Sequence, residues 1–153
     1  MARGDVHFFA AFELASKTGT SFNLTSDTIK MGIVTNTTIP GVGTAYPTWG
    51  AAGTTNFAAN EVATGTSYTA GGVTLTGVTY TQSAGVNTLA AANVTVAQDA
   101  AGFTNGYYGI LYDSTNANKY CIAFVDLGGP VSIQGGALQI NWNASGVGTE
   151  TAA

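Results

Sequence analysis

The residues that could carry out nucleophilic or acid–base chemistry are few and far apart in this chain. His7 is the single histidine and Cys121 the single cysteine among 153 residues. No serine lies in the G-x-S-x-G turn that exposes the nucleophile of an α/β-hydrolase. We therefore expect His7, beside Phe8, to be structural. We expect Cys121, in an apolar strand, to be a buried and unreactive thiol.

The acidic residues do not form a pattern of metal ligands. A zinc site needs clustered cysteines and histidines, and this chain has one of each. The stretch Asp113-Ser114-Thr115-Asn116 offers oxygens to calcium, but it lacks the acid spacing and the closing glutamate of an EF-hand. We interpret it as a hairpin turn whose side chains accept hydrogen bonds from backbone amides. The eight acids are Asp5, Glu13, Asp27, Glu61, Asp99, Asp113, Asp126 and Glu150. Their scatter argues weakly against a glycosidase carboxylate pair, because the fold sets such pairs.

The basic residues and glycines give no sign of a phosphate-binding site. Gly41-Val42-Gly43 lacks the third glycine of a dinucleotide fingerprint and the lysine of a P-loop. The four basic residues are far apart and the net charge is −4, so nothing resembles a basic patch for nucleic acid: Arg3, Lys17, Lys30 and Lys119. We predict no catalytic, cofactor-binding or metal-binding residue, no cofactor, no nucleic-acid partner, and no enzymatic activity.

The composition indicates one domain with an uncharged, hydroxyl-rich surface. The length suits a single domain over residues 1–153. Charged residues make up 8% of the chain, against about 25% in an average domain. Either much of this surface contacts another protein, or it belongs to a β protein whose faces carry Thr, Ser and Asn. No apolar run approaches the roughly 20 residues of a membrane span, so we expect no membrane contact. One cysteine allows no internal disulfide.

Strands must hold most of these residues in place. The stretch from Asn105 to Asn143 predicts a hairpin and a return strand, with strands at 107–112, 119–126 and 138–143. Tyr120, Ile122 and Phe124 share one face at period two, as do Leu138, Ile140 and Trp142. Two such faces exclude water by packing together, so this stretch is expected to form the core.

One helix is predicted near the N-terminus, at Val6–Lys17 within a helical segment over residues 1–20. Phe8, Phe9 and Phe12 fall on one face, Asp5 can cap the start, and Gly19 can end the helix. The helix either packs on the core or docks as an arm on a neighbouring subunit.

The remaining pattern predicts short strands and turns. Strands are expected at 28–35, 73–81, 93–98 and 131–133, with 86–92 ambiguous, and a helical turn at 56–63. The loop over 37–55 carries Tyr46 and Trp49, which either pin the loop to the body or face outward. A mobile tail is expected over 145–153. The fold class is mainly β: an antiparallel β-sandwich or barrel-like domain with one short N-terminal α-helix.

Three stretches, in order, carry a family resemblance. They are Leu24-Thr25-Ser26-Asp27-Thr28-Ile29-Lys30-Met31 after the helix, Tyr68-Thr69-Ala70-Gly71-Gly72, and Gly109-Ile110-Leu111-Tyr112-Asp113 followed by Asp126-Leu127-Gly128 and a strand ending near Trp142-Asn143. Together they resemble a family of small virion proteins from tailed bacteriophages. Residues 41–60 fit that pattern least.

The resemblance implies a non-enzymatic structural protein, made in the bacterial host cytoplasm and incorporated in the virion. The preferred role is a decoration or cement protein on the exterior of the phage head, bridging major capsid proteins. Its partners would be the major capsid protein, copies of itself in a homo-oligomeric lattice, or both. One alternative is a tail, neck or fibre-associated component, in which Tyr46 and Trp49 could form a sugar-binding platform. A second is a small hydrolase or lectin-like domain that uses His7.

Overall fold

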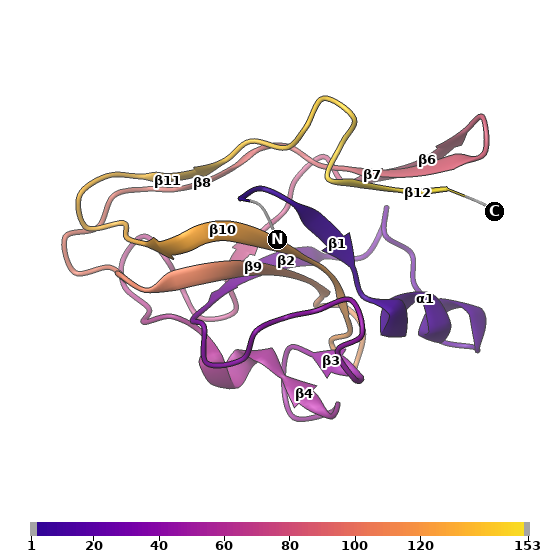
Figure 1. Ribbon diagram of the computed structural model, residues 1–153, viewed down its shortest axis with the longest axis horizontal. Coiled ribbons are helices and arrows are strands. Elements are labelled where there is room, and N and C mark those ends of the chain that lie inside the picture. Colours follow the sequence, from indigo (N-terminus) through magenta and orange to yellow (C-terminus); the bar gives the residue numbers. More distant parts are fainter. Residues whose placement is uncertain (1–2, 152–153) are drawn as a thin grey trace.

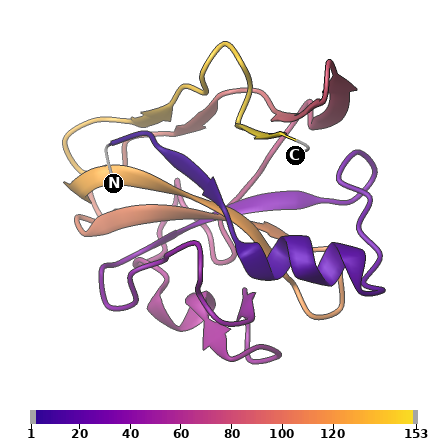
Figure 2. The same ribbon diagram turned by 45° about the vertical axis from the view of Figure 1, so that its right-hand side comes forward.

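The computed structural model describes residues 3–151, and strands dominate it (Figure 1). The antiparallel sheets do not close into a barrel, and residues 3–151 contain one short α-helix. This confirms the mainly β class predicted from the sequence. Figures 1 and 2 show one layer of strands above a central sheet, and short segments below that sheet.

A five-stranded sheet forms the centre, in the order β1-β10-β9-β2-β5. The strands are β1 (Val6–Phe8), β2 (Ile29–Val34), β5 (Val73–Thr74), β9 (Gly106–Asp113) and β10 (Cys121–Val131). The predicted hairpin is β9–β10, and the predicted strand at 28–35 is β2. A register shift between Cys121 and Ala123 interrupts the alternation, and residues 121–125 are all buried. The central strands therefore pack on both faces, as their continuous apolar runs require.

The upper layer consists of two smaller sheets (Figure 1). One has the order β12-β7-β6, with β6 (Thr79–Ser83), β7 (Val86–Ala90) and β12 (Gly148–Thr151). The other pairs β8 (Val94–Val96) with β11 (Leu138–Ile140). Leu138 and Ile140 are buried, and Trp142 packs against the core. The return strand therefore contributes the apolar face that was predicted, but it pairs with β8 and not with the hairpin.

The lower side of the central sheet is covered by residues 47–60. This part contains β3 (Pro47–Thr48), β4 (Thr55–Asn56) and the 3₁₀ helix η1 (Phe57–Asn60), which confirms the helical turn predicted at 56–63. Trp49 and Phe57 are buried there. The aromatic side chains of this loop thus hold it against the sheet.

The helix α1 spans Ala10–Lys17, so the prediction of a helix from Val6 is wrong. Residues 6–8 instead form β1, in which His7 lies opposite Phe124 of β10. Pairing with the hairpin overrides the local helical spacing of the phenylalanines. The N-cap is Phe9, without a side-chain hydrogen bond, and not Asp5. The buried residues Phe12 and Ala15 of α1 face the core.

Several other element boundaries differ from the predictions. The single strand expected at 73–81 is divided into β5 and β6, with Gly77 at φ +62° between them. The ambiguous stretch 86–92 contains β7. The short strand expected at 131–133 is replaced by an extension of β10 to Val131. Within the tail that was expected to be mobile, residues 148–151 form β12 on β7; residues 152–153 lie outside the described part.

Candidate interaction surface

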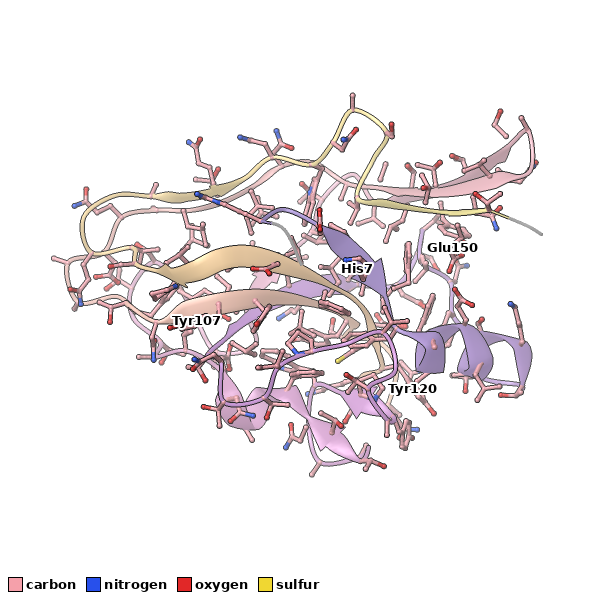
Figure 3. The ribbon with its side chains drawn as sticks, viewed as in Figure 1. His7, Tyr107, Tyr120 and Glu150 are labelled. Carbon is pink, nitrogen blue, oxygen red and sulfur yellow. The ribbon has the colours of Figure 1, made fainter. Side chains whose placement is uncertain are left out.

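The two residues considered as nucleophile or base, His7 and Cys121, are held by packing. His7 lies on β1 (Figure 3), and its ring centroid is 5.5 Å from that of Phe124. Cys121 is fully buried, and burial raises the pKa of its thiol. Within residues 3–151, no three His, Cys, Asp or Glu side chains are placed to hold a metal ion together. No α-helix in that range has the length and apolar character to cross a bilayer.

The turn after β9 is built as the sequence predicted. Asp113 Oδ1 accepts hydrogen bonds from the amides of Thr115, at 2.9 Å, and Asn116, at 3.1 Å. Asn116 Oδ1 in turn accepts one from the amide of Asn118, at 2.9 Å. These bonds close the hairpin, because they satisfy amides that the sheet leaves without partners.

The two aromatic residues proposed as a sugar platform do not form one. Trp49 is 4% exposed and lies flat against Tyr112. Tyr46 packs instead on Tyr120, with ring centroids 5.0 Å apart and hydroxyl oxygens 3.1 Å apart. The Trp49 ring is therefore unavailable to a ligand, and the pair offers no shared exposed face.

The clearest unpartnered feature is the outer edge of β6. Ala84 and Gly85 have φ of 49° and 81°, as in the two-residue turns that join twisted strands. Ser83 lies opposite Val86 across this turn. Because hydrogen-bonded pairs alternate along an antiparallel ladder, residues 79, 81 and 83 bond to β7. The backbone N–H and C=O groups of Tyr80 and Gln82 therefore point away from the sheet.

This edge carries none of the usual protection against strand pairing. Natural edges are blunted with lysine, proline, inward charges or bulges. The sequence of β6 is Thr-Tyr-Thr-Gln-Ser, without lysine or proline, and its pairing with β7 has no register shift. All of its residues are exposed except Tyr80, which is half-buried. Thr81, Thr88 and Thr149 lie side by side across the three strands. The outer face thus presents a row of hydroxyls instead of charges.

The inner face of the same sheet borders a groove of about 600 Å³. Helix α1 supplies Phe12 and Glu13 to one wall, and β6 and β12 supply Tyr80 and Glu150 to the other. Glu150 lies on the side of β12 nearest α1 (Figure 3). Tyr80 donates a hydrogen bond to Glu150 Oε2 at 2.5 Å. Burial and that hydrogen bond raise the pKa of Tyr80 to about 12, so the phenol stays neutral and ties β6 to β12.

Three large apolar side chains are exposed, one on α1 and two on the loop that follows β2. Leu14 is 63% exposed, Val42 50% and Ile39 66%. The amide of Ala10 donates to the carbonyl of Val42, which brings the loop against the first turn of the helix. We call Leu14, Ile39 and Val42 the exposed apolar residues. They are a second candidate contact, because exposed apolar groups gain by burial.

Comparison with known proteins adds no relative: no protein-family model, curated protein or solved structure matches this chain.

The prediction from sequence missed the β6 edge because it treated residues 73–81 as one strand. Two local signals could have revealed it. Gly77 interrupts the strand, and Ala84-Gly85 follows it as a tight turn.

Proposed function

We propose that this protein is a non-enzymatic structural component of a tailed-phage particle, and that it decorates the outside of the head by bridging major capsid proteins. The observation that carries the proposal is the unprotected edge of β6. A strand from a capsid neighbour, or from another copy of this chain, would pair with the outward backbone groups of Tyr80 and Gln82. The resemblance to small phage virion proteins and the low charge of the chain support this assignment.

Attachment would combine several weak contacts. Strand addition supplies backbone hydrogen bonds with little dependence on sequence. The row of threonines would add shape-matched area beside it, and the exposed apolar residues would add apolar contact. On a lattice each copy is held at several points, so modest individual affinities multiply into stable attachment.

The copy number in purified particles tests the placement. Quantitative mass spectrometry against the major capsid protein is expected to find hundreds of copies, as a head lattice requires. About a dozen copies would place the protein at the neck or tail instead. Absence from purified virions would overturn the proposal entirely.

The proposed edge can be blocked without touching the β6–β7 ladder. Gln82→Pro removes an outward N–H, and proline is tolerated on edge strands. Gln82→Thr keeps that N–H and is the matched control. Particles lacking the protein are expected to rebind the threonine variant normally and the proline variant at least ten-fold more weakly. Equal binding of two folded variants would exclude this edge as the contact.

Salt distinguishes this mode of attachment from an ionic one. With four basic residues spread over the chain, raising the salt from about 0.05 M to 0.5 M should release little protein, although it screens exposed charges. Release of most copies by such a modest increase would contradict attachment through backbone and apolar contacts.

A further inference from the structure

Two polar turns from distant parts of the chain are bound to each other at the end of the central sheet. The amide of Thr28, before β2, donates to Thr115 Oγ1 at 2.8 Å. The amide and hydroxyl of Ser114 both donate to the carbonyl of Thr28, at 2.9 and 2.7 Å. These bonds place Asp27 beside Asp113, although 86 positions separate the two in sequence.

Asp113 is fully buried, and one of its carboxyl oxygens lacks a donor. Oδ1 accepts the two turn amides described above, whereas Oδ2 is buried and receives no hydrogen bond from the described residues. The side-chain group within hydrogen-bond reach is the carboxyl of Asp27. Asp27 Oδ2 already accepts the amide of Asn23 at 2.7 Å. Asp113 Oδ2 therefore has no donor among the described residues, and the side chain that acts on it is another carboxyl, that of Asp27.

Two ionised carboxylates repel each other in such a site, so a proton or a cation between them would stabilise it. Calcium takes six to eight oxygens. The neighbouring carbonyl of Thr28 and hydroxyl of Thr115 are already hydrogen-bonded within the turns, and the pair itself offers few open positions. A proton needs only the two facing oxygens. Burial, followed by the charge of Asp27, raises the pKa of Asp113 above its usual value, against the lowering effect of the two turn amides.

We propose that Asp27 and Asp113 share one proton, and that this shared proton latches the turn at 23–28 to the hairpin turn at 113–118. Loss of the proton leaves two negative charges in contact, which push the turns apart. The latch is a pH-sensitive device of the fold itself, and it does not depend on the proposed attachment to a particle.

Among the described residues, no basic group contributes to the shift in the pKa of Asp113. The Nζ atom of Lys30, on the adjoining strand β2, lies instead near Gly71. Lys119 follows the hairpin turn, in left-handed conformation at φ 50°. Among the described residues, the charged group that acts on Asp113 is Asp27.

Separation of the two turns would also alter the groove beside α1. The turn at 23–28 follows Phe22 and includes the buried Leu24, and both residues line the groove beside α1. Phe22 also packs edge-on against Phe12 and Tyr120, with centroids 4.9 and 5.6 Å apart. Separation of the two turns would loosen one wall of that groove.

The sign of the pH effect follows from the raised pKa. A carboxyl that holds its proton more tightly in the folded state stabilises the fold below its unfolded pKa, near 3.9. That contribution is lost as the pH rises through the folded pKa.

Isosteric amides test the latch, because an amide N–H supplies the bridge without a proton from solvent. Asp113→Asn and Asp27→Asn each keep the existing acceptor oxygen and add a donor toward the other carboxylate. Melting temperatures of the full chain would be measured from pH 4.5 to 8, with Glu13→Gln, an exposed acid on α1, as control. Relative to wild type, each Asn variant is expected to gain at least about 3 °C over this range, whereas the control follows wild type.

Carboxyl ¹³C shifts of wild type provide a second measurement, which should show the pair titrating in two steps, one above the usual range. Two ordinary midpoints near 4, or a difference in melting temperature between wild type and the Asn variants that does not change with pH, would overturn the shared proton.

A further experiment adds 1 mM CaCl₂ or EDTA at pH 8. Stabilisation of wild type by calcium, lost in the Asn variants, would replace the proton with a cation and overturn the proposal.

Discussion

The indole of Trp49 lies parallel to the phenol ring of Tyr112, with centroids 4.9 Å apart and planes inclined by 5°. The indole also covers Gly32 of β2, where an added Cβ would meet the ring at 2.0 Å. The absence of a side chain at Gly32 thus allows the loop at 37–55 to press against the central sheet. This contact anchors the lower layer, because Trp49 offers a large apolar area.

Gly32→Ala is expected to lower the free energy of unfolding by about 3 kcal/mol, because the methyl group displaces the indole from its stack. Urea denaturation measures the loss. Gly43→Ala is the control, since no atom lies within 4 Å of a Cβ at that position, and it should leave stability nearly unchanged. A similar small effect at both glycines would contradict the packing described for Trp49.

Phe12→Ala is expected to cost about 3–5 kcal/mol, because the side chain is 6% exposed and packs among aromatic neighbours. Leu14→Ala, on the exposed side of the same helix, should change stability by about 0.5 kcal/mol or less. Chemical denaturation of both variants compares them within one helix. A loss below about 1 kcal/mol for Phe12 would favour the alternative of a helix that docks on a neighbouring subunit.

Tyr112→Phe is expected to cost about 1 kcal/mol at pH 7, because the phenol donates a 2.7 Å hydrogen bond to the carbonyl of Gly71. Burial, and then the charge of Glu61, raise the pKa of Tyr112 to about 12. The neutral phenol therefore stabilises the fold below the unfolded pKa near 10, and the contribution fades as the pH rises through 12. The cost of the substitution should shrink between pH 9 and pH 11.5 in denaturant titrations. A constant cost across that range would show that the phenol ionises alike in both states.

The Cys121 thiol should not react with a disulfide reagent in the folded protein, because it is fully buried and burial raises its pKa. One thiol per chain should react in denaturant, which serves as the control for reagent and count. Rapid labelling under native conditions would mean that β10 opens readily from the central sheet.

The candidate surface could be predicted only in part. Low charge and abundant threonine indicated a hydroxyl-rich surface, and the row of Thr81, Thr88 and Thr149 shows such a face. The free edge could not be predicted, since it depends on which strand lies beside β7. The proximity of Asp27 and Asp113 was equally hidden, because two acids that are distant in sequence meet only through the pairing of β2 with β9.

The sequence by itself determined the hairpin β9–β10, strand β2 and the turn at Asp113, because period-two patterns and turn residues act over a few neighbouring positions. The tertiary structure alone decided that Val6–Phe8 is a strand, that β11 pairs with β8, and that residues 148–151 join β7. Those choices depend on partners far along the chain, whose backbone groups and apolar faces compete for the same short segments. Local preference is weaker than that competition, so the distant contacts prevail.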